Sequence, residues 1–401
     1  MTGTLALLAL LPTAQWIPLF DGNSLAGWSQ KGGKAVYKIE KGEIVGSTVP
    51  GTPNSFLCTD KVYGDFELEF DVWVDPTINS GVQIRSNSVP GYKDGLVHGY
   101  QVEIDPSKRA WSGGIYDEGR RGWLQDLSKK PDAQAAFKNN QWNKYRVVAK
   151  GDRLQTWVNG KPVADLMDKV THTGFIGLQV HSHDKAGVQV KWRNLKIKDN
   201  GIPNANPPKG GKWILKGEGD LKNFVRAGQG EQPNPWEWVD GAMQVKGGSG
   251  SIVTKDKFTD CVFHMEFMTD ENGRSGQANG NSGVYLVQSY ELQILNSAPR
   301  GPADNECGGI YTIKAPDFAM AKPANEWQIY HIIYTAPKWN GTQKTANARA
   351  TIYHNGTLIH NDIELPQPTG AGAPESPDPR PFLLQDHGNK IRFRNIWAAQ
   401  K

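Results

Sequence analysis

Polar and apolar residues alternate along short runs over most of the chain, as in β-strands with one face buried and the other in water. The clearest run is 65–72, Asp-Phe-Glu-Leu-Glu-Phe-Asp-Val, and shorter ones cover 79–85 and 99–105. Asn-Gly at 159–160 supplies the tight turn of a hairpin. Helical periodicity is weak, and we expect at most a short surface helix at 132–139. The pattern predicts an all-β protein.

The same succession of runs occurs twice. A run opening with Asn-Ser-Gly, a second alternating run and a closing Gly-Gly-Ile-Tyr occupy 79–116 and return in the same order at 281–311. Two copies of domain size indicate tandem domains and not a solenoid. A stretch dense in Pro, Gly and Asn at 199–211 is the expected linker. We therefore predict two jelly-roll β-sandwiches, 15–198 and 212–401.

Composition fits this architecture and excludes one class of partner. The chain has 401 residues, of which 45 are Gly and 25 are Pro, as short strands joined by turns require. Its net charge is +4, from 45 basic and 41 acidic residues without a basic run, so nothing argues for a nucleic-acid partner. The 14 tryptophans can serve sandwich cores or sugar-stacking surfaces. The oligomeric state is left open.

The N-terminus and the cysteines bear on the compartment. An apolar run at 5–11 is followed by Pro-Thr-Ala, which is too short to span a bilayer and has the length of a secretory core. We expect 1–14 to be a signal peptide and the protein to be secreted or periplasmic, with a buried strand as the alternative. No other segment is apolar enough for a transmembrane span. Cys58, Cys261 and Cys307 lack metal-type spacing, and a Cys261–Cys307 disulfide stays open.

The 79–116 region is where we expect the chemistry. On its two strands, the side chains of Gln83 and Arg85, and of Gln101, Glu103 and Asp105, alternate with apolar ones. Adjacent strands would therefore present a wall of amide, guanidinium and carboxylate groups. Such a wall could simply bind sugar hydroxyls, as in a lectin, and fold alone does not separate this from catalysis.

A classical retaining glycosidase can be tested against the residues. It needs two carboxylates about 5–5.5 Å apart, and laminarinase-type families place them on one strand as Glu-x-Asp-x-x-Glu. The chain has Glu103-Ile-Asp-Pro-Ser-Lys108, with lysine at the second position, and 290–295 offers no partner for Glu291. Double-displacement hydrolysis is therefore disfavoured.

Together, the repeated motifs resemble a known family. Each copy adds an Asn-Gly hairpin, a Gln-x-His at 179–181 or 385–387, and a following Arg-Asn pair. The set, over about 17–198 and 213–399, resembles the 3-keto-disaccharide hydrolase family. The resemblance implies a concanavalin A-like sandwich. It also implies elimination or hydrolysis of glycosides already oxidised at C3.

That chemistry suits a site without a carboxylate pair. A ketone at C3 acidifies the C2 hydrogen, so one base can remove it while the C1 substituent departs. We assign Glu103 as base, Arg85 as enolate stabiliser and His181 as acid, with Glu291 and His387 as counterparts in the second copy. The residues expected to bind substrate hydroxyls are Gln83, Gln101, Asp105, Tyr116, Tyr285, Gln293 and Tyr311.

Two alternatives remain. A divalent metal ion held by Glu, Asp and His side chains could polarise the ketone in place of the arginine, and a protein of two carbohydrate-binding modules without activity is the rival function. The copies also differ: the second has Val287 at the position of Arg85, while the first reads Tyr-Gln-x-Glu where the second keeps the family's Tyr-Glu-x-Gln at 290–293. We favour the first copy as the enzyme.

Overall fold

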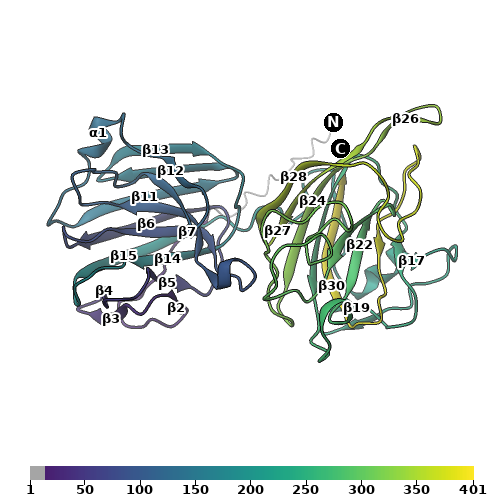
Figure 1. The fold of residues 1–401 in the computed structure, drawn as a ribbon, viewed down its shortest axis with the longest axis horizontal. Helices are drawn as coiled ribbons and strands as arrows, with labels where there is room; N and C mark the ends of the chain where they lie inside the picture. Colours follow the sequence, from purple (N-terminus) through teal and green to yellow (C-terminus); the bar gives the residue numbers. More distant parts are fainter. Residues whose placement is uncertain (1–13) are drawn as a thin grey trace, which may run out of the picture.

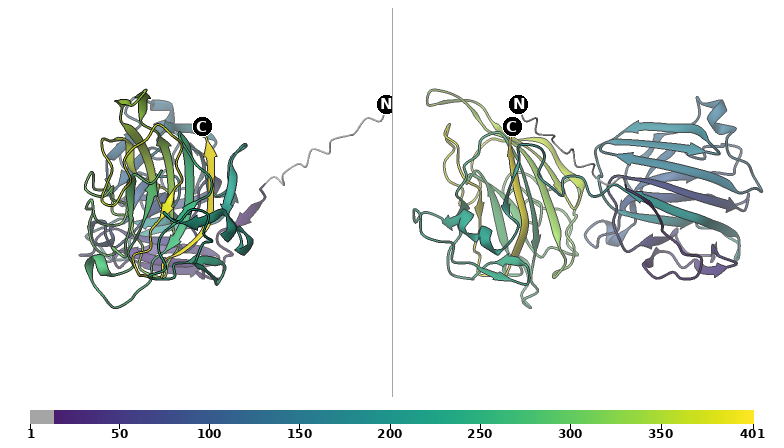
Figure 2. Two further views of the ribbon diagram at one scale, coloured as in Figure 1. Left: turned by 90° about the vertical axis from the view of Figure 1, so that its right-hand side faces the viewer. Right: turned by 180° about the vertical axis from the view of Figure 1, so that it is seen from behind.

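Two β-sandwiches lie side by side in the computed structural model, which describes residues 14–401 (Figure 1). The first contains strands β1 to β15 and the second β16 to β30, and all pairings are antiparallel. The view from behind again shows the two bodies side by side (Figure 2), and the chain passes from the first to the second between β15 and β16. The prediction of two all-β sandwiches is confirmed. Apart from Ala14, the predicted signal peptide 1–14 lies outside the described residues, and the cellular location stays a prediction.

The first domain pairs an outer sheet, ordered β13-β12-β11-β6-β15-β4-β3 with β1 beside β15, with an inner sheet, β10-β9-β8-β7-β14-β5-β2. The outer strands are β1 (Trp16–Pro18), β3 (Val36–Glu40), β4 (Glu43–Ser47), β6 (Phe66–Val74), β11 (Asn143–Lys150), β12 (Arg153–Val158), β13 (Lys161–Met167) and β15 (Gln189–Asp199). The inner strands are β2 (Trp28–Gly32), β5 (Ser55–Thr59), β7 (Ser80–Asn87), β8 (His98–Ile104), β9 (Ile115–Glu118), β10 (Gly122–Gln125) and β14 (Phe175–Val180). Its short helices are η1 (Lys93–Gly95) and α1 (Pro131–Gln134).

The second domain repeats this plan. Its sheets are ordered β18-β19-β30-β21-β24-β27-β28, with β16 beside β30, and β17-β20-β29-β22-β23. The strands of the larger sheet are β16 (Lys212–Leu215), β18 (Glu237–Val239), β19 (Ala242–Gln244), β21 (Cys261–Met268), β24 (Gln328–Thr335), β27 (Ala348–His354), β28 (Thr357–Leu365) and β30 (Arg392–Gln400). The others are β17 (Phe224–Arg226), β20 (Ile252–Thr254), β22 (Ser282–Leu286), β23 (Tyr290–Ile294), β29 (Leu383–Leu384), and the hairpin β25 (Lys338–Asn340) and β26 (Gln343–Ala346); η2 (Glu218–Asn223) and η3 (Gly276–Ala278) are short helices.

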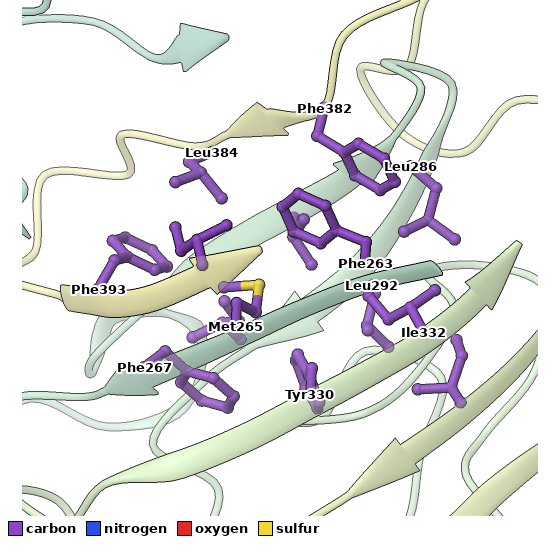
Figure 3. Packing of buried hydrophobic residues seen from close by; sticks show 14 of the residues in the cluster. Phe263, Met265, Phe267, Leu286, Leu292, Tyr330, Ile332, Phe382, Leu384 and Phe393 are labelled. Atoms are coloured by element: carbon purple, nitrogen blue, oxygen red, sulfur yellow. The ribbon is translucent and has the colours of Figure 1, made fainter. Parts of the chain in front are cut away.

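Alternating side chains build both cores. In β6 every second residue from Phe66 to Val74 is buried, so its apolar face lies between the sheets and its acidic face on the surface. On the inner sheet Val82, Ile84 and Val102 join the same core, as their pattern predicts. The second core is formed in the same way, with Phe263, Met265 and Phe267 of β21 packed against the facing sheet (Figure 3).

One difference between the copies falls beside the expected site. In the first domain β9 and β10 extend the inner sheet past β8, whereas on the outer side of β23 an isolated bridge between Leu292 and Ile310 replaces them. The chain from Tyr116 to Trp142 is correspondingly longer than the chain from Tyr311 to Trp327. The first domain therefore has the wider inner sheet.

Loops from each domain contact the other. The backbone N–H of His172 donates to Gly356 O (2.8 Å), that of Leu358 donates to Val170 O (2.8 Å), and the His172 ring stacks on Tyr353 with centroids 4.7 Å apart. From the other side, Val89 of the first domain packs into the second core. The hairpin turn at 355–356 is thus docked against the first domain by backbone pairing as well as side chains.

Three further expectations from the sequence can be compared with the structure. Cys58, Cys261 and Cys307 are all buried and free, so the Cys261–Cys307 disulfide that the sequence left open is not formed. Within residues 14–401 no helix has the length and apolarity needed to cross a bilayer. The helix expected at 132–139 is a single turn, α1.

The two hairpin glycines allow a matched test of docking. Gly160 and Gly356 both have positive φ (80° and 78°), but a Cβ on Gly160 meets nothing within 4 Å, whereas one on Gly356 would lie 2.0 Å from Thr173 Oγ1. Gly160→Ala should lower the free energy of unfolding by roughly 1–2 kcal/mol through backbone strain alone. Gly356→Ala should lose more and separate the unfolding of the two domains into two calorimetric transitions. Equal losses with one shared transition would contradict this docking.

Candidate functional site

A hollow of about 370 Å³ lies on the inner sheet of the first domain. This volume is in the range of small-molecule sites. The lining residues come from β8, β9, β10 and β14 and from the loops at their ends. They are Asn54, Asn79, Gln101, Glu103, Arg109, Tyr116, Glu118, Trp123, Gln179 and His181.

Glu103 is held on the floor of the hollow by three donors. Its Oε1 accepts from Asn79 Nδ2 (2.6 Å) and Arg109 Nη2 (2.9 Å), and its Oε2 accepts from Gln101 Nε2 (2.9 Å). Gln101 is in turn held by Gln83, whose Nε2 donates to Gln101 Oε1 (2.7 Å). In the series of hydrogen bonds from Gln83 through Gln101 to Glu103, every donor points towards the carboxylate, so the bonds reinforce one another.

A glycine makes this arrangement possible. Gly81 of β7 pairs with Glu103 of β8, and a Cβ on Gly81 would lie 2.4 Å from Gln101 Cδ. The Gln101 side chain therefore lies across the space that any other residue at 81 would fill. This is the structural reason for glycine in the Asn-Ser-Gly motif.

Burial sets the protonation of Glu103. The residue is 3% exposed, and this desolvation raises the pKa of its carboxyl above the ordinary value, against the opposing effects of Asn79, Gln101 and the Arg109 charge. A carboxylate with a raised pKa is a better proton acceptor near neutral pH. One lone-pair direction of Oε2 has no donor in the hydrogen bonds described above, so the carboxylate keeps an acceptor position free.

Arg109 supplies the positive charge of the hollow. Its Nε donates to Asp105 Oδ2 (2.7 Å) and its Nη2 to Glu103, while the guanidinium carbon lies 4.9 Å and 5.0 Å from the ring centres of Trp111 and Trp123. Two carboxylates and two indoles thus fix its orientation. Its Nη1 is left for a ligand.

The structure does not place Arg85 with Glu103, and that prediction is wrong. Arg85 is fully buried and donates to Gly64 O (2.8 Å), Gly151 O (2.7 Å) and Asp65 Oδ1 (2.9 Å), linking the two sheets. The cause is a β-bulge in β7, where Arg85 has a φ of 46°. The bulge ends the period-two alternation from which a shared face was inferred.

The other predicted residues of the first copy divide into two groups. Gln101, Tyr116 and His181 line the hollow with Glu103. Gln83 is fully buried beneath Gln101. Asp105 faces a neighbouring depression and touches the hollow only through Arg109.

Sequence reasoning missed six lining residues, one of which is Asn79 of the Asn-Ser-Gly motif. Five others lie outside that motif. These are Asn54, Arg109, Glu118, Trp123 and Gln179. Glu118 is half-buried, and its desolvation raises the pKa of its carboxyl. Trp123 lies edge-on to Tyr116, with ring centres 5.2 Å apart. The extra length between Tyr116 and Trp142 was the signal for β9 and β10, and Gln179 stood in the noted Gln-x-His motif.

In the second domain a loop covers the corresponding surface. Thr369 Oγ1 accepts from the backbone N–H of Glu291 (2.5 Å), and the Thr369 N–H donates to Ser289 O (3.0 Å). A Cβ on Gly370 would lie 3.2 Å from Glu291 Oε2 and 3.4 Å from the Tyr311 ring. The Pro-rich segment 366–381, which we call the strap, therefore lies directly over Glu291.

The predicted second-copy residues on β22 and β23 are accordingly buried and paired within the domain. Glu291 is 5% exposed and accepts from Tyr285 OH (2.9 Å), and Gln293 lies beside Gln277 (3.0 Å). Only His387 is exposed. The carboxylate also differs in position: Gly283 pairs with Gln293, as Gly81 pairs with Glu103, so Glu291 corresponds to Gln101.

A metal site was one of the sequence's alternatives. Among residues 14–401 no group of three or more His, Cys, Asp and Glu side chains has an arrangement suited to hold a metal ion. The polarising charge that these residues themselves supply in the hollow is Arg109.

Comparison with known families decides the relationship. Residues 15–198 and 212–399 each match the family described as the 3-keto-alpha-glucoside-1,2-lyase-like domain. The chain belongs to this family. The resemblance inferred from the motifs is thereby confirmed for both copies of the lyase-like domain, and the chain is a member of a carbohydrate-active family.

Solved structures similar to the lyase-like domains each cover one of them. A "putative glycosyl hydrolase" from Parabacteroides distasonis is 28% identical, with a TM-score of 0.45, over 48% of this chain and 85% of its own. A carbohydrate-binding module from Bacillus subtilis is 20% identical, with a TM-score of 0.33, over 43% of this chain and 96% of its own. A search of curated proteins found no match.

The raised pKa of Glu103 predicts a pH-dependent stability. A carboxyl that holds its proton more tightly when folded stabilises the fold at low pH, and this contribution is lost as pH rises from the ordinary glutamate value through the raised one. In Glu103→Gln the contribution is absent at every pH. The Tm of the variant relative to wild type should therefore rise between pH 4 and pH 7; a difference that is constant over this interval would contradict a raised pKa.

Proposed function

We propose that the first domain cleaves glycosides whose sugar is oxidised at C3, by elimination across C1 and C2. The observation that supports this best is the buried Glu103 carboxylate, with its raised pKa, beside the free Nη1 of Arg109 in a hollow of small-molecule size. Such an elimination needs one base and one group that stabilises the enolate. The family description as lyase-like supports the same reaction.

The reaction balances with the residues of the hollow. Glu103 Oε2 takes the proton from C2, and the electrons of that C–H bond form the C2–C3 enolate, whose oxygen Arg109 Nη1 stabilises. The enolate then re-forms the C3 ketone as the C1–O bond breaks, with its electron pair leaving on the aglycone oxygen. The products are a 1,2-unsaturated 3-ketone and the free aglycone; addition of water to the former gives overall hydrolysis.

His181 is the proposed acid for the leaving oxygen. Its Nδ1 lies 2.9 Å from Ser182 O, and in the tautomer that donates to this carbonyl Nδ1 carries the proton. Nε2 is therefore the nitrogen that gains and gives a proton at the hollow. Its half-buried position in the lining of the hollow suits a departing aglycone.

The two copies should differ in activity. Glu103→Gln should lower turnover of a 3-keto-glucoside by 100-fold or more, because proton transfer loses its base, whereas Glu291→Gln, beneath the strap, should leave turnover near wild type. Aglycone release gives the rate, and mass spectrometry of the sugar product separates elimination from hydrolysis by the mass of one water. Loss of activity in Glu291→Gln alone would move the reaction to the second domain. Tight binding of plain glycans by the wild type, with no turnover of any 3-keto-glycoside, would favour the binding-protein rival.

Arg109 should also set the pH profile. Its charge holds the pKa of Glu103 down against burial, and Glu103 must be ionised to act as base. Arg109→Met should therefore shift the acid limb of kcat/KM to higher pH as well as lower kcat. Arg109→Lys, which keeps the charge, should shift the limb less, and Arg146→Met on the outer sheet should not shift it. An acid limb unmoved in Arg109→Met would exclude the proposed coupling.

A further inference from the structure

Gln179 is a buried amide with no internal partner. It lies on β14, is 1% exposed and lines the hollow. Neither its Oε1 nor its Nε2 has a hydrogen-bond partner among residues 14–401. Buried amides are almost always hydrogen-bonded, so an unpaired one facing a hollow indicates a place that a bound molecule completes.

In the second domain the corresponding residue, Gln385, is half-satisfied: its Oε1 has no partner among residues 14–401, but its Nε2 has one. Gln385 corresponds to Gln179, because Leu384 pairs with Val284 as Leu178 pairs with Val82. Its Nε2 donates to Tyr285 OH (3.3 Å). In the first domain the place of Tyr285 is taken by Gln83, which is committed to Gln101. The first domain, whose hollow is open, is thus the one in which this glutamine donates no hydrogen bond to another described residue.

Register places Gln179 across the hollow from Glu103. Since Leu178 pairs with Val82, Gln179 lies opposite Gly81, and Gly81 pairs with Glu103 on its other side. The strands β14 and β8 are therefore two strand spacings apart, roughly 10 Å. The Gln101 amide forms the floor between them. A pyranose ring with a hydrogen bond at each edge spans about this distance.

We propose that Gln179 is a substrate-binding residue whose amide binds the 4- and 6-hydroxyls of the oxidised sugar. The inference rests on the proposed function, since a ring with C2 at Glu103 presents its C4–C5 edge to the opposite strand. One amide offers a donor and an acceptor side by side, which matches two neighbouring hydroxyls. The hollow would then select a terminal pyranose unsubstituted at O4 and O6.

The test compares Gln179→Leu with Gln385→Leu, the matched change in the second domain. Gln179→Leu should raise KM for a 3-keto-glucoside about tenfold with kcat little changed, as expected for the loss of ground-state hydrogen bonds, and Gln385→Leu should change neither. For the wild type, removing the 4- or 6-hydroxyl from the substrate should raise KM by a similar factor. For Gln179→Leu, KM should be the same for the 4-deoxy, the 6-deoxy and the complete substrate. Unchanged KM in Gln179→Leu, or full discrimination by this variant, would overturn the proposal.

A binding measurement separates this proposal from the reaction itself. Calorimetric titration with unoxidised methyl glucoside requires no turnover, and wild type should bind it more tightly than Gln179→Leu. If the wild type cleaves no 3-keto-glycoside but this difference is found, the proposed reaction fails and the role of Gln179 in sugar binding stands. If wild type and Gln179→Leu are both folded and bind methyl glucoside with equal affinity, Gln179 does not bind the sugar, whatever the reaction.

Discussion

A carboxylate removed from water has to be held by hydrogen-bond donors, and the inner sheet of the first domain is arranged around that requirement. Asn79, Gln101 and Arg109 all donate to Glu103. Gln101 reaches it only because residue 81 has no side chain. The donors keep the group ionisable, while burial raises its pKa. The protonation of Glu103 therefore depends on the balance between these two effects.

The sequence predicted the fold because its signals are local and strong. The alternation in 65–72 and the Asn-Gly turns specify strands and hairpins whatever surrounds them, and the duplicated order of motifs specifies two domains. Of the four hollow residues that matched, Glu103 and Gln101 came from a strictly alternating strand, and Tyr116 came from the repeated Gly-Gly-Ile-Tyr turn. His181 came from a repeated motif.

The errors arose where local pattern does not decide the outcome. Arg85 was placed by extending the alternation through a bulge, and a positive φ at a non-glycine residue has no clear sequence signal there. Arg109 reaches Glu103 from a loop, and its position depends on stacking against Trp111 and Trp123. The strap over Glu291 is also a tertiary event, since composition indicates a surface loop but not the surface that it covers.

Duplication has given one fold two different interiors. In the second domain the carboxylate is Glu291, at the position of Gln101. In the first domain it is Glu103, two residues further along the strand, where it pairs with the glycine of the neighbouring strand. The added β9–β10 hairpin then widens the hollow with Tyr116 and Trp123, whereas the strap closes the second domain. The difference between the two interiors thus depends on these few exchanges and on which loops are long.

The turn at 355–356 of the second domain pairs with an edge of the first domain. If domains of this kind docked one after another in the same way, nothing in the contact itself would limit their number. Here the matching edge of the second domain is altered. The β-bridge between Phe258 and Arg380 corresponds to the bridge between Tyr63 and Gly174 in the first domain. Counting back from these bridges, Pro377 and Pro379 occupy the positions of Thr171 and Thr173. Prolines offer no N–H for pairing, and the intervening Asp378 N–H is already bonded to Ser376 Oγ (3.1 Å). The second domain therefore does not reproduce the edge on which its own hairpin turn docks in the first.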